Sequence, residues 1–180
     1  MIVYHGSNHR FQKLRISKSL IERQSTLENE GCGIYFSTDR TVAESYGKYV
    51  YTLEINDTYF QDFRKQEVCE NYINQLQQYI LSKTNINLHD YIDFESIITY
   101  AKCGGIAISG IGHELYLMLD STESFYTSLS DTKRKQLYRI LNQYDKHNLN
   151  AYMFTYHIPN IGVIKNINSD IVTIIKRESR

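Results

Sequence analysis

The sequence predicts a single α+β domain, built on a mixed or antiparallel sheet with flanking helices. Its 180 residues match the length of one domain whose core is large enough to fold alone. Strand-like segments are numerous, and the helical segments are grouped between them instead of alternating with them one by one. This grouping is typical of α+β folds and argues against a regular β-α-β sheet.

The N-terminal third contains three strand-like segments and one short helix. Residues 2–4, 34–36 and 49–55 are rich in β-branched and aromatic side chains, which favour strands. A short helix is predicted over 41–46, just before the third strand. Residues 7–31 are polar and are expected to be irregular.

The rest of the chain alternates between longer helices and short strands. Helices are predicted over 61–83, 93–102 and 131–147, and the first has apolar residues at every fourth position. A hairpin is expected over 106–119, and closing strands over 152–157, 163–164 and 171–175. The whole of 1–180 is taken as one domain, with 121–180 as an extension or as the late part of the fold.

Composition and charge exclude several classes of protein. The 20 Lys and Arg residues balance the 20 Asp and Glu residues, which argues against a protein that binds nucleic acid by bulk charge. The three Cys form no C-x-x-C pair, so a reducing compartment is expected. The first apolar stretch ends at His5, and no run reaches the roughly 18 apolar residues of a membrane span. We therefore expect a cytoplasmic protein without membrane contact, which is compatible with delivery into a host cell.

Common cofactor and metal motifs are absent. No G-x-G-x-x-G follows a strand, and no G-x-x-x-x-G-K-[ST] occurs, so neither a Rossmann site nor a P-loop is supported. The six His residues form no H-E-x-x-H and pair with no Cys. No metal is therefore expected.

Two segments carry residues suited to binding a flat ring. The first strand ends in His5-Gly6, where a glycine without a Cβ lets a ligand approach the backbone closely. The second segment places Tyr35 on a strand and Tyr46 on the next helix, eleven residues apart. Two facing phenol rings form a slot for an aromatic ligand. With the backbone of Gly6, such a slot suits a ring that bears a carboxamide, as nicotinamide does.

These residues resemble a known family. His5-Gly6-Ser7, Gly33-Ile34-Tyr35-Phe36 and Tyr46 match in type, order and spacing the diphtheria-toxin and poly(ADP-ribose) polymerase type of ADP-ribosyltransferases, often called the H-Y-E class. The resemblance covers residues 1–55 best and the remainder only in outline. It implies an ADP-ribosyltransferase-like fold with a split sheet, and NAD as co-substrate.

The resemblance also implies roles at the NAD site. His5 would hydrogen-bond the adenosine ribose, and the backbone of Gly6 would hold the nicotinamide carboxamide. Tyr35 and Tyr46 would sandwich the nicotinamide ring.

Three further positions bear on the same site. Ser7 and Ser37 lie beside these residues in the chain and are expected to line it. Ala43 stands where many polymerase relatives carry a serine that touches the carboxamide, so one hydrogen bond is expected to be missing.

The acidic residue of the triad has two candidates. Glu114 opens a strand after a glycine-rich turn, as the family's catalytic glutamate does, and is favoured as catalytic beside His5 and Tyr35. Tyr152, in the closing segment, is the alternative and would resemble family members that lack the glutamate. A carboxylate at this position would stabilise positive charge that develops on the ribose as nicotinamide leaves.

The expected function is that of a mono-ADP-ribosyltransferase acting as a toxin, effector or phage-encoded modifier. It would release nicotinamide and transfer ADP-ribose to a macromolecule, more readily a protein than a nucleic acid. An NAD glycohydrolase or a catalytically silent binding module are the alternatives. A neutralising partner protein is compatible with this role, and the oligomeric state is left open.

Overall fold

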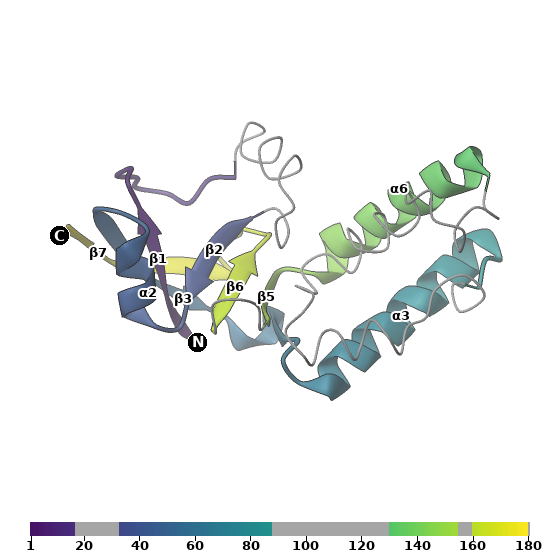
Figure 1. Ribbon diagram of the computed structural model, residues 1–180, viewed down its shortest axis with the longest axis horizontal. Coiled ribbons are helices and arrows are strands. Elements are labelled where there is room, and N and C mark those ends of the chain that lie inside the picture. Colours follow the sequence, from purple (N-terminus) through teal and green to yellow (C-terminus); the bar gives the residue numbers. More distant parts are fainter. Residues whose placement is uncertain (17–32, 88–129, 155–159, 180) are drawn as a thin grey trace.

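A computed structural model describes residues 1–16, 33–87, 130–154 and 160–179 of the protein. Strands and helices alternate irregularly along them, as expected for an α+β fold (Figure 1). The elements are β1 (Ile2–Ser7), β2 (Ile34–Ser37), α2 (Arg40–Ser45), β3 (Tyr49–Ile55), η1 (Asp57–Tyr59), β4 (Phe60–Asp62), α3 (Gln66–Thr84), α6 (Asp131–Asn148), β5 (Ala151–Phe154), β6 (Ile161–Ile164) and β7 (Val172–Ser179).

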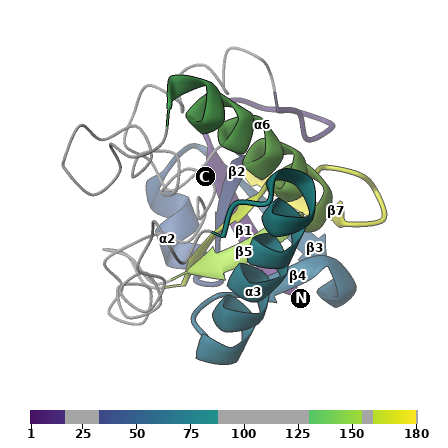
Figure 2. The same ribbon diagram turned by 90° about the vertical axis from the view of Figure 1, so that its right-hand side faces the viewer.

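The described strands form one mixed sheet, so the predicted α+β class is confirmed. Its order is β4-β5-β6-β2-β1-β3-β7. The β4/β5 pair is parallel, and the other neighbouring pairs are antiparallel. Helix α2 packs on β1, whereas α3 and α6 pack on each other and extend from the β4/β5 end of the sheet (Figures 1 and 2).

One face of the sheet carries the main core. Side chains alternate between the two faces of a strand, so register partners share a face. Val3 on β1 pairs with Leu53 on β3, and both are fully buried. Ile34 on β2 and Ile164 on β6 are likewise partners in the same cluster. Apolar residues of the segment after β1 cover this face: Phe11, Leu14 and Ile16 pack against it.

Several element boundaries differ from the prediction. Helix α3 begins at Gln66 instead of residue 61, because Phe60–Asp62 pair with β5 as strand β4. Strand β1 continues to Ser7, so His5 lies within the strand and not at its end. Strand β7 continues through Lys176, Arg177 and Glu178, whose charges suit an edge strand.

Some expectations lie outside the described residues. They are the helix over 93–102, the hairpin over 106–119 and the last part of the strand predicted over 152–157. Among the described helices, none combines the length and apolarity that crossing a bilayer requires.

Candidate functional site

The candidate site lies at the point where β1 and β2 separate, which we call the joint of the two strands. Strand β1 has six register pairs with β3 but a single one with β2, between Tyr4 and Ser37. Beyond that pair the two strands are joined by a side chain, because His5 Nδ1 lies 2.7 Å from the carbonyl oxygen of Tyr35. The first histidine and the first tyrosine of the predicted site are therefore in direct contact, through the tyrosine backbone.

This contact determines which nitrogen of the imidazole carries the proton. A carbonyl oxygen can only accept, so Nδ1 carries the proton and donates it to Tyr35. Burial lowers the pKa of His5 below its ordinary value, and the hydrogen bond to Tyr35 only partly opposes this effect. The neutral ring then exposes the lone pair of Nε2, which makes no hydrogen bond to any described residue. His5 is thus suited to accept a hydrogen bond from a ligand hydroxyl group.

Gly6 allows α2 to rest directly on β1. A Cβ at Gly6 would lie 1.8 Å from the carbonyl oxygen of Ala43 and 3.0 Å from the Cβ of Tyr46. Only a glycine permits this approach of two backbones. The glycine predicted for ligand binding therefore has a packing role as well, and it brings the end of α2, with Tyr46, next to the strand.

The two tyrosines of the predicted slot are on the α2 side of the sheet. Tyr46 is the C-terminal cap of α2 and is 54% exposed, so one of its ring faces can receive a ligand. Tyr35 is half-buried on β2. It shares a sheet face with Ser37, whose register partner is Tyr4, and therefore with Gly6.

His5 projects from the opposite face of β1. Its register partner is Tyr51, which belongs to the main core face. One face of the sheet thus carries Gly6, Tyr35 and Tyr46, whereas the His5 side chain lies on the other face, at the same joint. A ligand that contacts all four residues must lie at the joint between β1 and β2.

The two predicted serines take part in local hydrogen bonds. The Oγ of Ser7 accepts from the backbone N–H of His9 at 3.1 Å. Ser37 is buried, and its Oγ accepts from the backbone N–H of Asp39 at 3.0 Å. Each hydroxyl therefore shapes the chain around the site, Ser7 at the end of β1 and Ser37 between β2 and α2.

The two candidates for the acidic position of the triad are Glu114 and Tyr152. Glu114 lies outside the described residues. Tyr152 on β5 is fully buried, and its ring packs against Phe63 at a centroid distance of 5.9 Å. It shares a register row with Val163 and Tyr35, which places β5 two strands, or about 10 Å, from β2.

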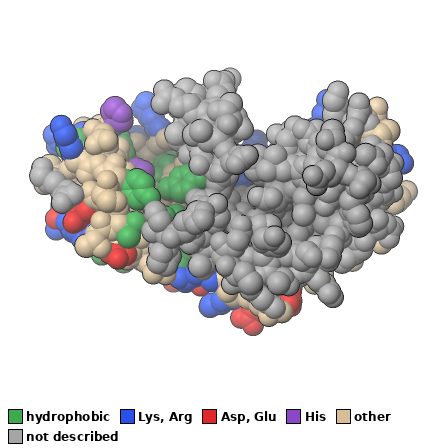
Figure 3. Space-filling view, viewed as in Figure 1, with side chains coloured by type: hydrophobic (Ala, Val, Ile, Leu, Met, Phe, Trp, Pro, Cys, Tyr) green, Lys and Arg blue, Asp and Glu red, His purple; other side chains and the backbone are tan. Residues whose placement is uncertain are grey.

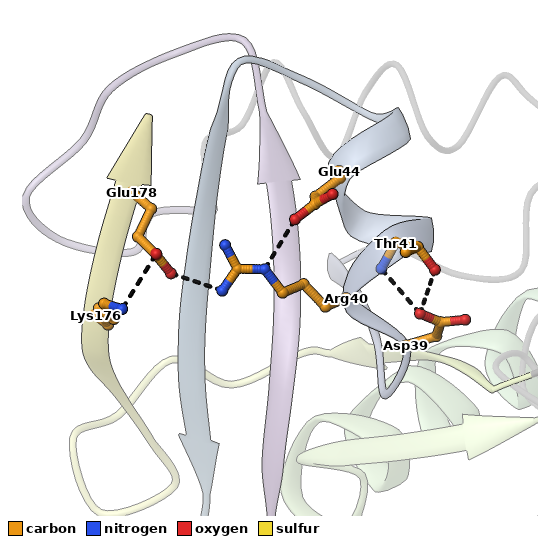
Figure 4. Close-up of polar contacts among 6 residues, drawn as sticks. All are labelled: Asp39, Arg40, Thr41, Glu44, Lys176 and Glu178. Carbon is orange, nitrogen blue, oxygen red and sulfur yellow. Dashed lines mark hydrogen bonds and ion pairs between the residues drawn. The ribbon is translucent and has the colours of Figure 1, made fainter. Parts of the chain in front are cut away.

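Ion pairs and a helix cap hold α2 in place (Figure 4). The Asp39 carboxylate accepts from the backbone N–H and the hydroxyl of Thr41, which keeps the pKa of Asp39 below its ordinary value. Arg40 reaches across the sheet and donates to Glu178 on β7 and to Glu44, each at 2.8 Å. The bond to Arg40 lowers the pKa of Glu178. These contacts fix the start of the helix whose end carries Tyr46.

Two residues near His5 were missed from the sequence. The rings of Phe11 and Tyr51 lie 5.9 and 6.1 Å from the imidazole. On the face seen in Figure 3, a His side chain lies beside a group of hydrophobic ones. The alternation in Lys48–Ile55 could have placed Tyr51 on one sheet face, but only the register with β1 brings it beside His5.

Within the described ranges, no three His, Cys, Asp or Glu side chains come together as a metal site requires. No protein-family model matches the chain. No curated protein matches it.

One solved structure is similar to the chain. It is described as the crystal structure of an anti-CRISPR protein, and it aligns over 97% of this chain and 95% of its own, with a TM-score of 0.44 and 12% sequence identity.

Proposed function

We propose that the protein is an NAD-dependent mono-ADP-ribosyltransferase that transfers ADP-ribose to a macromolecular acceptor, most readily a protein. The observation that carries the proposal is the hydrogen bond from His5 to the carbonyl of Tyr35 at the joint of β1 and β2. It joins two residues that lie 30 positions apart in the chain. Gly6 and the exposed ring of Tyr46 adjoin the same joint.

The proposed reaction breaks the bond between the ribose C1 atom and the nicotinamide nitrogen. Nicotinamide leaves with the bonding electron pair, and the ribose gains positive charge. A nucleophilic group of the acceptor then bonds to C1 and loses its proton. Groups that stabilise the transient positive charge more than they stabilise bound NAD accelerate this step.

In this reaction some residues bind NAD, and one stabilises the charge that develops on the ribose. Neutral His5 accepts a hydrogen bond from a ribose hydroxyl at Nε2, since Nδ1 already donates to the carbonyl oxygen of Tyr35. Tyr35 and Tyr46 hold the nicotinamide ring between their own rings, and the backbone of Gly6 binds its carboxamide. Glu114 is the proposed carboxylate that faces the ribose as the bond breaks.

Tyr46→Ala tests the ring-binding part of the proposal. Loss of a stacking aromatic side chain removes about 1–3 kcal/mol of binding free energy, so NAD affinity should fall by about 5- to 150-fold. Titration calorimetry of NAD with both proteins measures this difference. Tyr59→Ala is the matched control, because Tyr59 is also an exposed tyrosine but lies on η1, after β3.

The control should bind NAD as the wild type does. Equal NAD affinity of a folded Tyr46→Ala protein and the wild type would exclude Tyr46 from the binding site and remove the slot from the proposal.

A further inference from the structure

Tyr51 is fully buried, and its hydroxyl uses both of its hydrogen-bonding functions. It accepts from the backbone N–H of Phe11 at 2.8 Å and donates to the carbonyl oxygen of His9 at 3.1 Å. A buried hydroxyl is costly unless it is hydrogen-bonded, so both bonds matter for stability. Through them β3 holds the backbone of residues 9–11.

The same side chain organises the aromatic surroundings of His5. The rings of Phe11 and Tyr51 are stacked, with centroids 3.8 Å apart and planes at 8°. The imidazole contacts both rings and lies directly opposite Tyr51 in the β1/β3 register. Tyr51 therefore provides one wall beside His5 and keeps the second wall, Phe11, in position.

No carboxylate of the described residues faces the imidazole from this side. The titratable and charged groups of the elements packed against it are Tyr49, Tyr51 and Arg177 on its sheet face, with His9, Arg10, Lys13 and Arg15 in the segment above. Arg177 turns to the carbonyl of Gln12, to which it donates at 2.7 Å. The glutamates of β3 and β7 occupy register positions of the opposite face. Burial is therefore the main cause of the lowered pKa of His5, and the rings of Phe11 and Tyr51 are part of what buries it.

We propose that Tyr51 is a positioning residue, whose hydroxyl latches residues 9–11 over His5 and so fixes the imidazole for its ligand. The hydrogen bonds of Tyr51 and their effect on His5 can be measured in the protein without NAD. Its consequence for NAD cleavage rests on the proposed function.

Tyr51→Phe tests the latch, since it keeps the ring and its stacking but removes both hydrogen bonds. Amide exchange of Phe11 should become about 2- to 10-fold faster, as expected for the loss of one hydrogen bond. The pKa of His5, followed by NMR, should rise toward about 6.5 as water reaches the ring. Nicotinamide release at saturating NAD should fall by about 10- to 100-fold, the cost of a misplaced catalytic group.

Tyr49→Phe is the control, because Tyr49 lies on the same face of the same strand and its hydroxyl bonds to no described residue. It should leave all three readouts unchanged. An unchanged Phe11 exchange rate and an unchanged His5 pKa in Tyr51→Phe would overturn the proposal, whatever the activity. A wild-type protein that releases no nicotinamide would refute the proposed function alone, since the exchange and pKa readouts need no NAD.

Phe11→Leu tests the covering of His5 by residues 9–11 if Tyr51→Phe does not fold. It removes the second aromatic wall and leaves the Tyr51 ring in the core. The pKa of His5 should again rise toward about 6.5. A His5 pKa identical to that of the wild type would show that the aromatic walls do not govern the imidazole and would contradict the proposal.

Discussion

Glu114→Gln should slow nicotinamide release by about 10²- to 10³-fold while changing NAD affinity little. The substitution keeps the size of the side chain and one hydrogen-bonding oxygen but removes the charge. If Glu114 faces the ribose, its charge matters most when the bond to nicotinamide breaks, and one preorganised electrostatic contact of this kind has such an effect on rate. Turnover should therefore fall far more than binding. Steady-state kinetics together with NAD calorimetry separate the two quantities.

Tyr152→Phe is the matching experiment for the alternative position. Tyr152 is fully buried on β5, so removal of its hydroxyl should leave the rate of nicotinamide release within a few-fold of the wild type. The opposite pattern, with near-normal release by Glu114→Gln and a collapse in Tyr152→Phe, would move the chemistry to β5. Glu114 would then have no part in the reaction.

Gly6→Ala should lower the free energy of unfolding by about 2 kcal/mol. An added Cβ would come 1.8 Å from the carbonyl oxygen of Ala43, and because this atom belongs to the backbone the whole of α2 must move. Such overpacking costs about 3 kcal/mol, whereas alanine in a strand recovers only about 0.5–1 kcal/mol relative to glycine. The steric effect prevails. Urea unfolding of both proteins measures the difference.

Ser7→Ala is the control for this stability measurement. Ser7 follows Gly6 on the same strand, and its Oγ makes one exposed hydrogen bond, to the N–H of His9. Its loss should cost less than about 1 kcal/mol. A Gly6→Ala protein as stable as Ser7→Ala would show that α2 does not depend on the close approach to β1.

The sequence revealed the local elements better than the pairing between them. Residues 34–36 and 49–55 were recognised as strands because their β-branched and aromatic side chains have a local preference. The sequence predicts residues 61 and 62 as the start of a helix, because β4 exists only through its parallel pairing with β5, about 90 positions later. The end of β7 was missed for a similar reason, since its charged residues suit only an edge strand.

In the candidate site, too, the residues could be predicted but the contacts between them could not. His5, Gly6, Tyr35 and Tyr46 could be selected from motif and spacing alone. The contact between His5 and the carbonyl of Tyr35 could not, because it depends on where β1 and β2 separate. Tyr51 was likewise out of reach, since a shift of one residue in the register would turn it to the other face of the sheet.

The fate of radiolabelled NAD tests the central proposal most directly. The protein is incubated with NAD labelled in the adenylate part and with a whole-cell lysate, with and without nuclease treatment. The proposed activity predicts nicotinamide release together with label that stays on nuclease-resistant macromolecules and disappears when Glu114→Gln replaces the wild type. An intact NAD pool after prolonged incubation, with no nicotinamide and no labelled macromolecule, would contradict the proposal that this protein is an ADP-ribosyltransferase.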